Sequence, residues 1–145
     1  MKRREWITTF LTVVVGLFAL LAAAPATTAA PSDAEYARCA RACRDCAQAC
    51  QACNKHCAGM VKSGMKQHEK SLRLSADCME ICSLCGKLCA RKGPLAVAVA
   101  DACLKACQTC GTECDKYPTM GPMAACAKSC KSCETACRKL ISTAK

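Results

Sequence analysis

The stretch Cys39–Cys57, CARACRDCAQACQACNKHC, holds six cysteines at successive intervals of 4, 3, 4, 3 and 4 residues. Intervals of 3 and 4 place side chains on one face of an α-helix, at the a and d core positions of a heptad. A β-strand would need intervals of 2, and none separates these cysteines. Most residues between them are Ala, Gln, Lys and Arg, which favour helix. The stretch therefore predicts an amphipathic helix with a buried face of thiols.

The same spacing recurs three more times, in groups of four cysteines at intervals of 4, 3 and 4. Each group predicts a further helix with thiols at its core positions. The four groups are Cys39, Cys43, Cys46, Cys50, Cys53 and Cys57; Cys78, Cys82, Cys85 and Cys89; Cys103, Cys107, Cys110 and Cys114; and Cys126, Cys130, Cys133 and Cys137.

Helix boundaries are indicated by capping residues, glycine and proline. Ser32–Glu35 is a capping box that starts the first helix. We expect the first and second helices to be separated by residues 59–64, the second and third by Gly93–Pro94, and the third and fourth by residues 117–122. Short connections between four helices predict an all-α fold, an antiparallel up-down-up-down four-helix bundle with cysteines lining its core.

Continuing the steps of 3 and 4 beyond the cysteines distinguishes the two ends of this bundle. At the end where the first helix begins, Tyr36 and Leu140 are expected to close the core, and the steps place Lys92, Ala96 and Ala100 there too. Soft thioethers and imidazoles gather at the other end, which predicts an open end where metal enters. These residues are His56, Met60, Met65, His68, Met120 and Met123, with Tyr117 among them.

The first 26 residues have the features of an export signal. A basic start, MKRREW, precedes the apolar run Phe10–Ala24 and the small-residue cleavage site Ala24–Pro25–Ala26. Arg3–Arg4 resembles a twin-arginine signal, with ordinary Sec export and cleavage after Ala29 or Ala30 as alternatives. We therefore expect residues 1–26 to be cleaved and residues 27–145 to form the mature domain, outside the cytoplasm and without stable membrane insertion.

The charge of residues 27–145 is basic, with 18 Lys and Arg against 10 Asp and Glu. A basic protein can bind nucleic acid or anionic membranes. Here the basic residues alternate with the cysteines at exposed helix positions, and no nucleic-acid-binding motif accompanies them. The distribution predicts a solvated surface and no nucleic-acid partner.

Eighteen core cysteines need a chemical explanation, because Leu and Ile are almost absent from the same positions. Packing alone explains one or two buried cysteines, since cysteine behaves as a small apolar side chain. An exported, cysteine-rich chain is often held by disulfides. However, cysteines four residues apart in one helix have poor geometry for a disulfide. A disulfide-braced structural or thiol-redox protein remains an alternative.

Metal binding is the preferred hypothesis. Zinc and iron–sulfur sites usually need four converging ligands on turns, whereas here the cysteines follow continuous helices. Soft thiolates select Cu(I). If each Cu(I) takes two thiolates and each thiolate bridges two ions, the buried core is neutral, whereas separate four-thiolate zinc sites would carry negative charge. The pattern predicts many Cu(I) ions held by all eighteen cysteines, with a broad Zn, Cd and Cu scavenger as a further alternative. No catalytic motif accompanies them, which predicts a protein without enzyme activity.

The four C-x3-C-x2-C-x3-C groups, the longer first group, the His/Met-rich end and the segment CDKYPTM at residues 114–120 resemble the bacterial copper storage proteins. The resemblance covers nearly all of residues 27–145. It implies a four-helix bundle that stores Cu(I) on inward cysteines, with entrance at the His/Met end and assembly into homotetramers. It also implies that exported members carry twin-arginine signals and buffer copper in the periplasm or supply it to a copper enzyme or chaperone.

Overall fold

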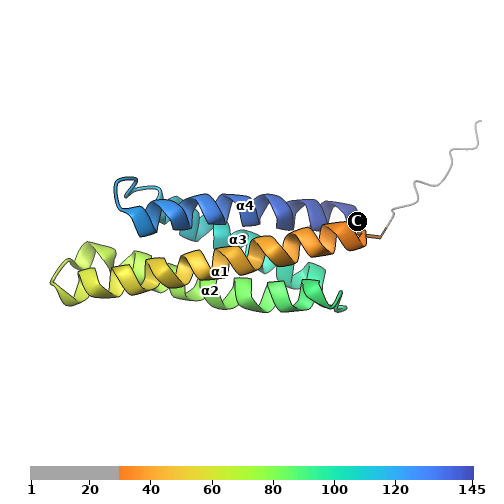
Figure 1. Ribbon diagram of the computed structural model, residues 1–145, viewed down its shortest axis with the longest axis horizontal. Helices are drawn as coiled ribbons and strands as arrows, with labels where there is room; N and C mark the ends of the chain where they lie inside the picture. Colours follow the sequence, from red (N-terminus) through yellow and green to blue (C-terminus); the bar gives the residue numbers. More distant parts are fainter. Residues whose placement is uncertain (1–29) are drawn as a thin grey trace, which may run out of the picture.

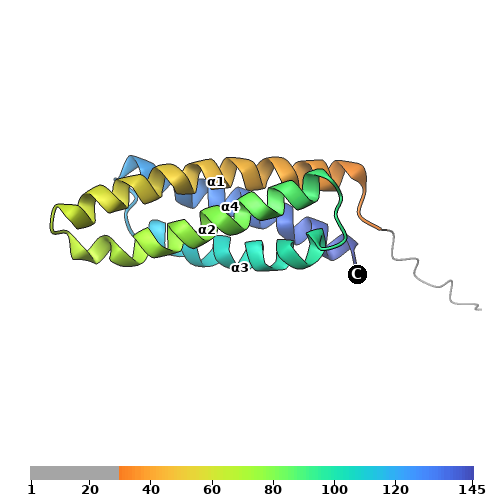
Figure 2. The ribbon, with the colours of Figure 1, turned by 90° about the horizontal axis from the view of Figure 1, so that it is seen from below.

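The computed structural model describes residues 30–145, and they form four long α-helices and one short 3-10 helix (Figure 1). Consecutive helices run antiparallel, and α1 and α3 each pack against both α2 and α4 (Figure 2). The expected all-α four-helix bundle is confirmed. The elements are α1 (Asp33–Lys62), η1 (Lys66–His68), α2 (Glu69–Ala90), α3 (Ala96–Cys114) and α4 (Gly121–Thr143).

The expected signal in residues 1–26 lies outside the described residues. Within residues 30–145, none of the helices combines the length and the apolar character needed to cross a bilayer. The expected capping box at the start of α1 is confirmed. The Ser32 amide donates to Glu35 Oε2 at 2.8 Å, and the Glu35 amide donates to Ser32 Oγ at 3.3 Å.

The first two helices are joined by a shorter connection than expected. Gly59 was predicted to lie between them, but α1 continues through it to Lys62, so this boundary was wrong. A single exposed glycine costs a helix only about 0.5–1 kcal/mol, too little to end one that is anchored by buried cysteines on the preceding turns. The chain reverses instead at Gly64, whose φ of 90° suits glycine.

At the end of α2, a lysine takes the left-handed conformation that glycine usually adopts. Lys92 has a φ of 51°, and the following Gly93 amide donates to the Leu88 carbonyl at 2.9 Å. This is the hydrogen bond of a Schellman motif. Lys92 is exposed, and its Nζ lies 3.0 Å from Asp33 Oδ1. Pro94 precedes α3 by two residues, so it is not in the first turn of that helix as predicted.

The interior of the bundle consists almost entirely of cysteine. All eighteen cysteines are at most 1% exposed, together with Ala96, Ala100, Met123 and Leu140. At the end where α1 begins, Leu140 is fully buried and Tyr36 packs partly buried against the core. This end, called the closed end below, is filled as the sequence predicts, although Lys92 lies outside the core.

Helices α3 and α4 approach closely at Gly111. A Cβ atom at this position would lie 3.1 Å from the Cβ of Cys130, which has little freedom to move. We therefore expect Gly111→Ala to lower the free energy of unfolding by about 1–3 kcal/mol. Gly59→Ala is the matched control, because nothing lies within 4 Å of its new Cβ. It should instead stabilise the helix by about 0.5–1 kcal/mol. Urea unfolding of both variants measures the difference, and equal effects would contradict this packing.

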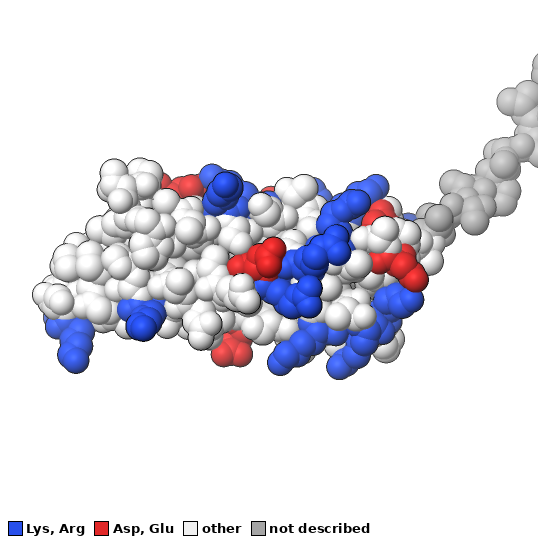
Figure 3. Space-filling view, viewed as in Figure 1, with Lys and Arg blue, Asp and Glu red and all other residues white. Residues whose placement is uncertain are grey.

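Lys and Arg side chains lie on the outer surface, among many uncharged residues (Figure 3). On the face shown they are denser toward the closed end, and Asp and Glu side chains lie among them. Several form exposed ion pairs, such as Lys105 with Asp101 at 2.8 Å. The basic charge therefore lies outside the bundle, whereas the chemistry of the core depends on sulfur.

Candidate metal centre

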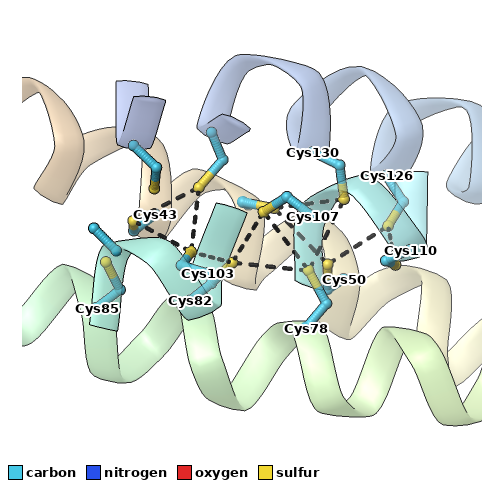
Figure 4. Close-up of a cluster of buried hydrophobic side chains, with 14 of the residues drawn as sticks. Cys43, Cys50, Cys78, Cys82, Cys85, Cys103, Cys107, Cys110, Cys126 and Cys130 are labelled. Atoms are coloured by element: carbon cyan, nitrogen blue, oxygen red, sulfur yellow. Dashed lines mark hydrogen bonds between the residues drawn. The ribbon is translucent and has the colours of Figure 1, made fainter. Parts of the chain in front are cut away.

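The cysteine side chains of all four helices point to the bundle axis, where their sulfur atoms meet (Figure 4). The closest pair is Cys82 Sγ and Cys103 Sγ, at 3.5 Å between α2 and α3. Neighbouring sulfurs within one helix are slightly farther apart, as for Cys39 and Cys43 at 3.9 Å. The core is thus a continuous thiol-lined interior and not a set of isolated cysteines.

Thirteen of the sulfurs form one set linked by hydrogen-bonding contacts of 4.0 Å or less, here called the central sulfur network. The other five fall into two smaller groups: the mouth thiols, Cys53, Cys57 and Cys114, and the end pair, Cys85 and Cys89. The members of the central sulfur network are Cys39, Cys43, Cys46, Cys50, Cys78, Cys82, Cys103, Cys107, Cys110, Cys126, Cys130, Cys133 and Cys137.

Groups of four sulfurs within 4.8 Å of one another overlap along the axis. One such group takes a single cysteine from each helix: Cys46, Cys78, Cys107 and Cys130. Cys46 and Cys107 also belong to a second group, with Cys82 and Cys133. Shared sulfurs suit metal ions that are bridged by thiolates, whereas separate zinc sites would each need four sulfurs of their own.

Hydrogen bonds and burial shift the thiol pKa values in opposite directions. Burial raises the pKa of Cys57 to about 12. A hydrogen bond with Cys114 lowers the pKa of Cys53 to about 3, and one with Cys107 lowers the pKa of Cys46. Neighbouring sulfurs therefore hold their protons with different strengths. Metal ions bound between them would take the place of those protons.

The structure places the expected His and Met residues at one end, formed by residues 63–68 and the α3–α4 loop and here called the mouth. His68 and Met123 are fully buried, and the His68 ring lies 4.6 Å from that of Tyr117, centroid to centroid. His56, Met60, Met65 and Met120 are partly buried. Among the described residues, His56 Nε2 and both ring nitrogens of His68 are buried without a hydrogen-bond partner. The mouth therefore holds two imidazoles, and each can offer one nitrogen to a metal ion.

Two core positions of α2 are occupied by serine, and the cysteine spacing alone does not indicate them. Steps of 3 and 4 lead back from Cys78 to Ser75 and Ser71, and both are fully buried. Ser75 Oγ donates to the Leu72 carbonyl at 3.0 Å, and Asn54 Nδ2 donates to Ser75 Oγ at 3.2 Å. Ser71 Oγ is buried without a partner. Near the mouth, α2 therefore contributes hydroxyl groups where the other core positions carry thiols.

A buried carboxylate also lies near the mouth, and the sequence pattern did not indicate it. Glu113 is 5% exposed, and its Oε2 lies 2.7 Å from Lys116 Nζ and 3.4 Å from Lys70 Nζ. Burial raises the pKa of Glu113, but the hydrogen bonds and charges of both lysines outweigh it, so the pKa is lowered. This charged cluster connects the start of α2 to the end of α3.

The sequence and the fold of this chain are both similar to those of known proteins. Residues 32–142 match the family model described as copper storage protein. Apo copper storage protein 3 from Bacillus subtilis is 32% identical with a TM-score of 0.63, covering 72% of this chain and 96% of that one. No curated protein matches the chain significantly.

A copper-bound relative has a similar structure. A cytosolic copper storage protein from Streptomyces lividans, with five coppers, is 32% identical with a TM-score of 0.68, covering 76% of this chain and 94% of that one. A structure of the copper storage protein from Streptomyces lividans loaded with 10 copper equivalents is 31% identical with a TM-score of 0.70, covering 82% and 92%.

Proposed function

Because the chain belongs to the copper storage protein family, we propose that it stores many copper ions as Cu(I) on the thiolates of its core. The observation that carries this proposal is the meeting of all eighteen buried thiols along one axis, in overlapping groups of four. Soft thiolates favour Cu(I) over harder cations. The protein thus acts as a reservoir and not as a catalyst.

Charge balance favours Cu(I) over zinc in this core. A buried thiolate needs a nearby cation, and the basic side chains are on the outer surface. One Cu(I) per bridging thiolate gives a neutral interior. A four-thiolate zinc site would retain two negative charges, which the apolar surroundings of Ala96, Ala100 and Leu140 do not balance.

We propose that copper enters at the mouth. A buried polar atom without a partner costs about 1–3 kcal/mol, and among the described residues His56 Nε2 and both ring nitrogens of His68 are such atoms. Each neutral imidazole could give one nitrogen ligand to a metal ion. The thioethers of Met60, Met65, Met120 and Met123 are soft ligands that would pass Cu(I) on to the mouth thiols. The closed end, filled by Leu140, offers no comparable set of ligands.

The test is an anaerobic titration of the reduced protein with Cu(I) in the presence of a chelator that colours when it binds Cu(I). We expect no colour until on the order of one equivalent per cysteine has been added. The same protein with all thiols alkylated is the control and should colour the chelator at once. Colour after one or two equivalents of the unmodified protein would contradict a Cu(I) reservoir.

We further propose that the protein is exported, assembles as a homotetramer and buffers copper outside the cytoplasm or supplies it to a copper enzyme or chaperone. Arg3 and Arg4 support a twin-arginine signal. Arg3→Lys/Arg4→Lys should leave uncleaved protein in the cytoplasm, as measured by cell fractionation. Unchanged export of this variant would indicate the Sec route.

The proposed homotetramer is tested separately. Light scattering of the mature protein measures the number of subunits.

A further inference from the structure

The mouth combines imidazole nitrogens with the sulfur atoms of methionines and cysteines. His68 is fully buried, and neither of its ring nitrogens has a partner among the described residues. His56 adds a further free nitrogen. Imidazole suits copper, and nitrogen donors are typical of Cu(II), whereas thiolates select Cu(I). This mixture of ligands suits copper that arrives oxidised and is stored reduced.

The mouth thiols contain a pair placed to act as an electron donor. Cys53 Sγ on α1 and Cys114 Sγ on α3 lie 3.7 Å apart. They belong to different helices, so they avoid the poor disulfide geometry of cysteines four residues apart in one helix. Forming a disulfide would require the two sulfurs to approach to about 2.05 Å, through side-chain rotation and a small helix displacement.

The mouth thiols form the outermost sulfur contacts of the core. Cys53 contacts Cys57 at 4.0 Å and Cys114 at 3.7 Å, and no contact of 4.0 Å or less joins these three sulfurs to the other fifteen in residues 30–145, although Cys110 and Cys126 are near enough to affect the pKa of Cys114. On the α2 side, the adjacent core positions hold Ser71 and Ser75, whose hydroxyls cannot exchange with a disulfide. A disulfide between Cys53 and Cys114 uses two thiols and leaves the thirteen of the central sulfur network to bind metal.

We propose that the mouth reduces Cu(II) during uptake, with the buried His68 imidazole receiving the incoming ion and the Cys53–Cys114 pair supplying the electrons. Two Cu(II) ions each gain one electron and become Cu(I). Cys53 and Cys114 each give up one electron, one S–S bond forms, and any proton still bound to either sulfur leaves to solvent. The reaction occurs once per reduced pair, so it is stoichiometric and not catalytic. This inference rests on the proposed copper uptake through the mouth.

The experiment mixes the reduced, metal-free protein anaerobically with two equivalents of Cu(II). We expect the electron paramagnetic resonance signal of Cu(II) to disappear while two thiols are lost, with one disulfide for every two copper ions. Tandem mass spectrometry of the digested protein should locate this disulfide at Cys53–Cys114. A persistent Cu(II) signal, or a disulfide located mainly elsewhere, would overturn the proposal.

Two double variants that each remove two thiols provide the matched comparison. Cys53→Ser/Cys114→Ser should reduce Cu(II) at least about tenfold more slowly than Cys85→Ser/Cys89→Ser, which removes the end pair. Equal rates would count against the proposal. Circular dichroism checks that both variants are folded, and the disulfide location in the unmodified chain does not depend on either of them.

A Cu(I) titration of the same samples separates this inference from the proposed function. If the protein binds many Cu(I) ions but leaves Cu(II) oxidised, reduction at the mouth is wrong and storage stands. If it binds no more than one or two Cu(I) ions, the proposed storage function is wrong as well.

Discussion

Loading the reduced protein with Cu(I) should raise its melting temperature by more than about 20 °C. The metal-free core has little apolar area to stabilise it, because the large, fully buried side chains other than cysteine are Met123, Leu140 and His68. Each copper–thiolate bond between helices adds the free energy of metal binding to that of folding. A structural zinc ion contributes about 10–16 kcal/mol in small domains, so a set of copper ions should have a large effect.

This change is measured by anaerobic thermal unfolding, followed by circular dichroism at the helical band. Removing the copper with a strong Cu(I) chelator should return the melting temperature to that of the metal-free protein. The thiol-alkylated protein mixed with copper controls for nonspecific effects. Equal melting temperatures with and without copper would show that the metal does not bind the folded core.

Replacing two cysteines in the middle of the bundle should reduce copper capacity more than replacing two at its end. Cys46 has sulfur contacts with Cys50, Cys107 and Cys130 at 3.7–3.9 Å, so it lies at a junction of the central sulfur network. In a bridged core each thiolate holds two ions. Cys46→Ser/Cys107→Ser would therefore deprive up to about four Cu(I) ions of a ligand, because serine oxygen is a hard donor.

Cys85→Ser/Cys89→Ser is the matched variant, since it also removes two thiols. The two sulfurs contact each other at 3.9 Å and have no other sulfur contact of 4.0 Å or less within residues 30–145, although Cys85 lies within 4.8 Å of the sulfurs of Cys39, Cys43 and Cys137. We expect this variant to lose only about two Cu(I) ions. Both capacities come from the chelator titration, with protein concentration measured by amino-acid analysis. Equal losses from the two variants would indicate that each cysteine binds copper independently and that sulfurs do not bridge.

Most of the architecture could be predicted from the sequence because helix periodicity is a local property. Intervals of 3 and 4 determine which side of each helix carries thiols, whatever the helix packs against. The capping box at Ser32 was predictable for the same reason, since it involves residues three apart. The short connections then allowed few arrangements other than an antiparallel bundle. In such a bundle the end of α1 and the start of α2 lie together, so both histidines were expected at one end.

The sequence predicted helix ends less well where tertiary packing outweighs local helix propensity. Gly59 suggested a helix end, yet buried cysteines on the preceding turns hold α1 together through it. At the end of α2 the left-handed position is occupied by Lys92 and not by Gly93. The backbone there follows the geometry needed to lead into α3, and the lysine accepts the strained conformation while pairing with Asp33.

The amino-acid sequence was enough to predict four helices with thiols on their inner faces and with nitrogen and thioether ligands at one end. Which sulfurs come into contact across helices, such as Cys53 with Cys114, depends on the packed structure. The reason is physical. The side on which a residue lies depends on its own helix, whereas a distance of 3.7 Å between sulfurs depends on how two helices slide and rotate against each other.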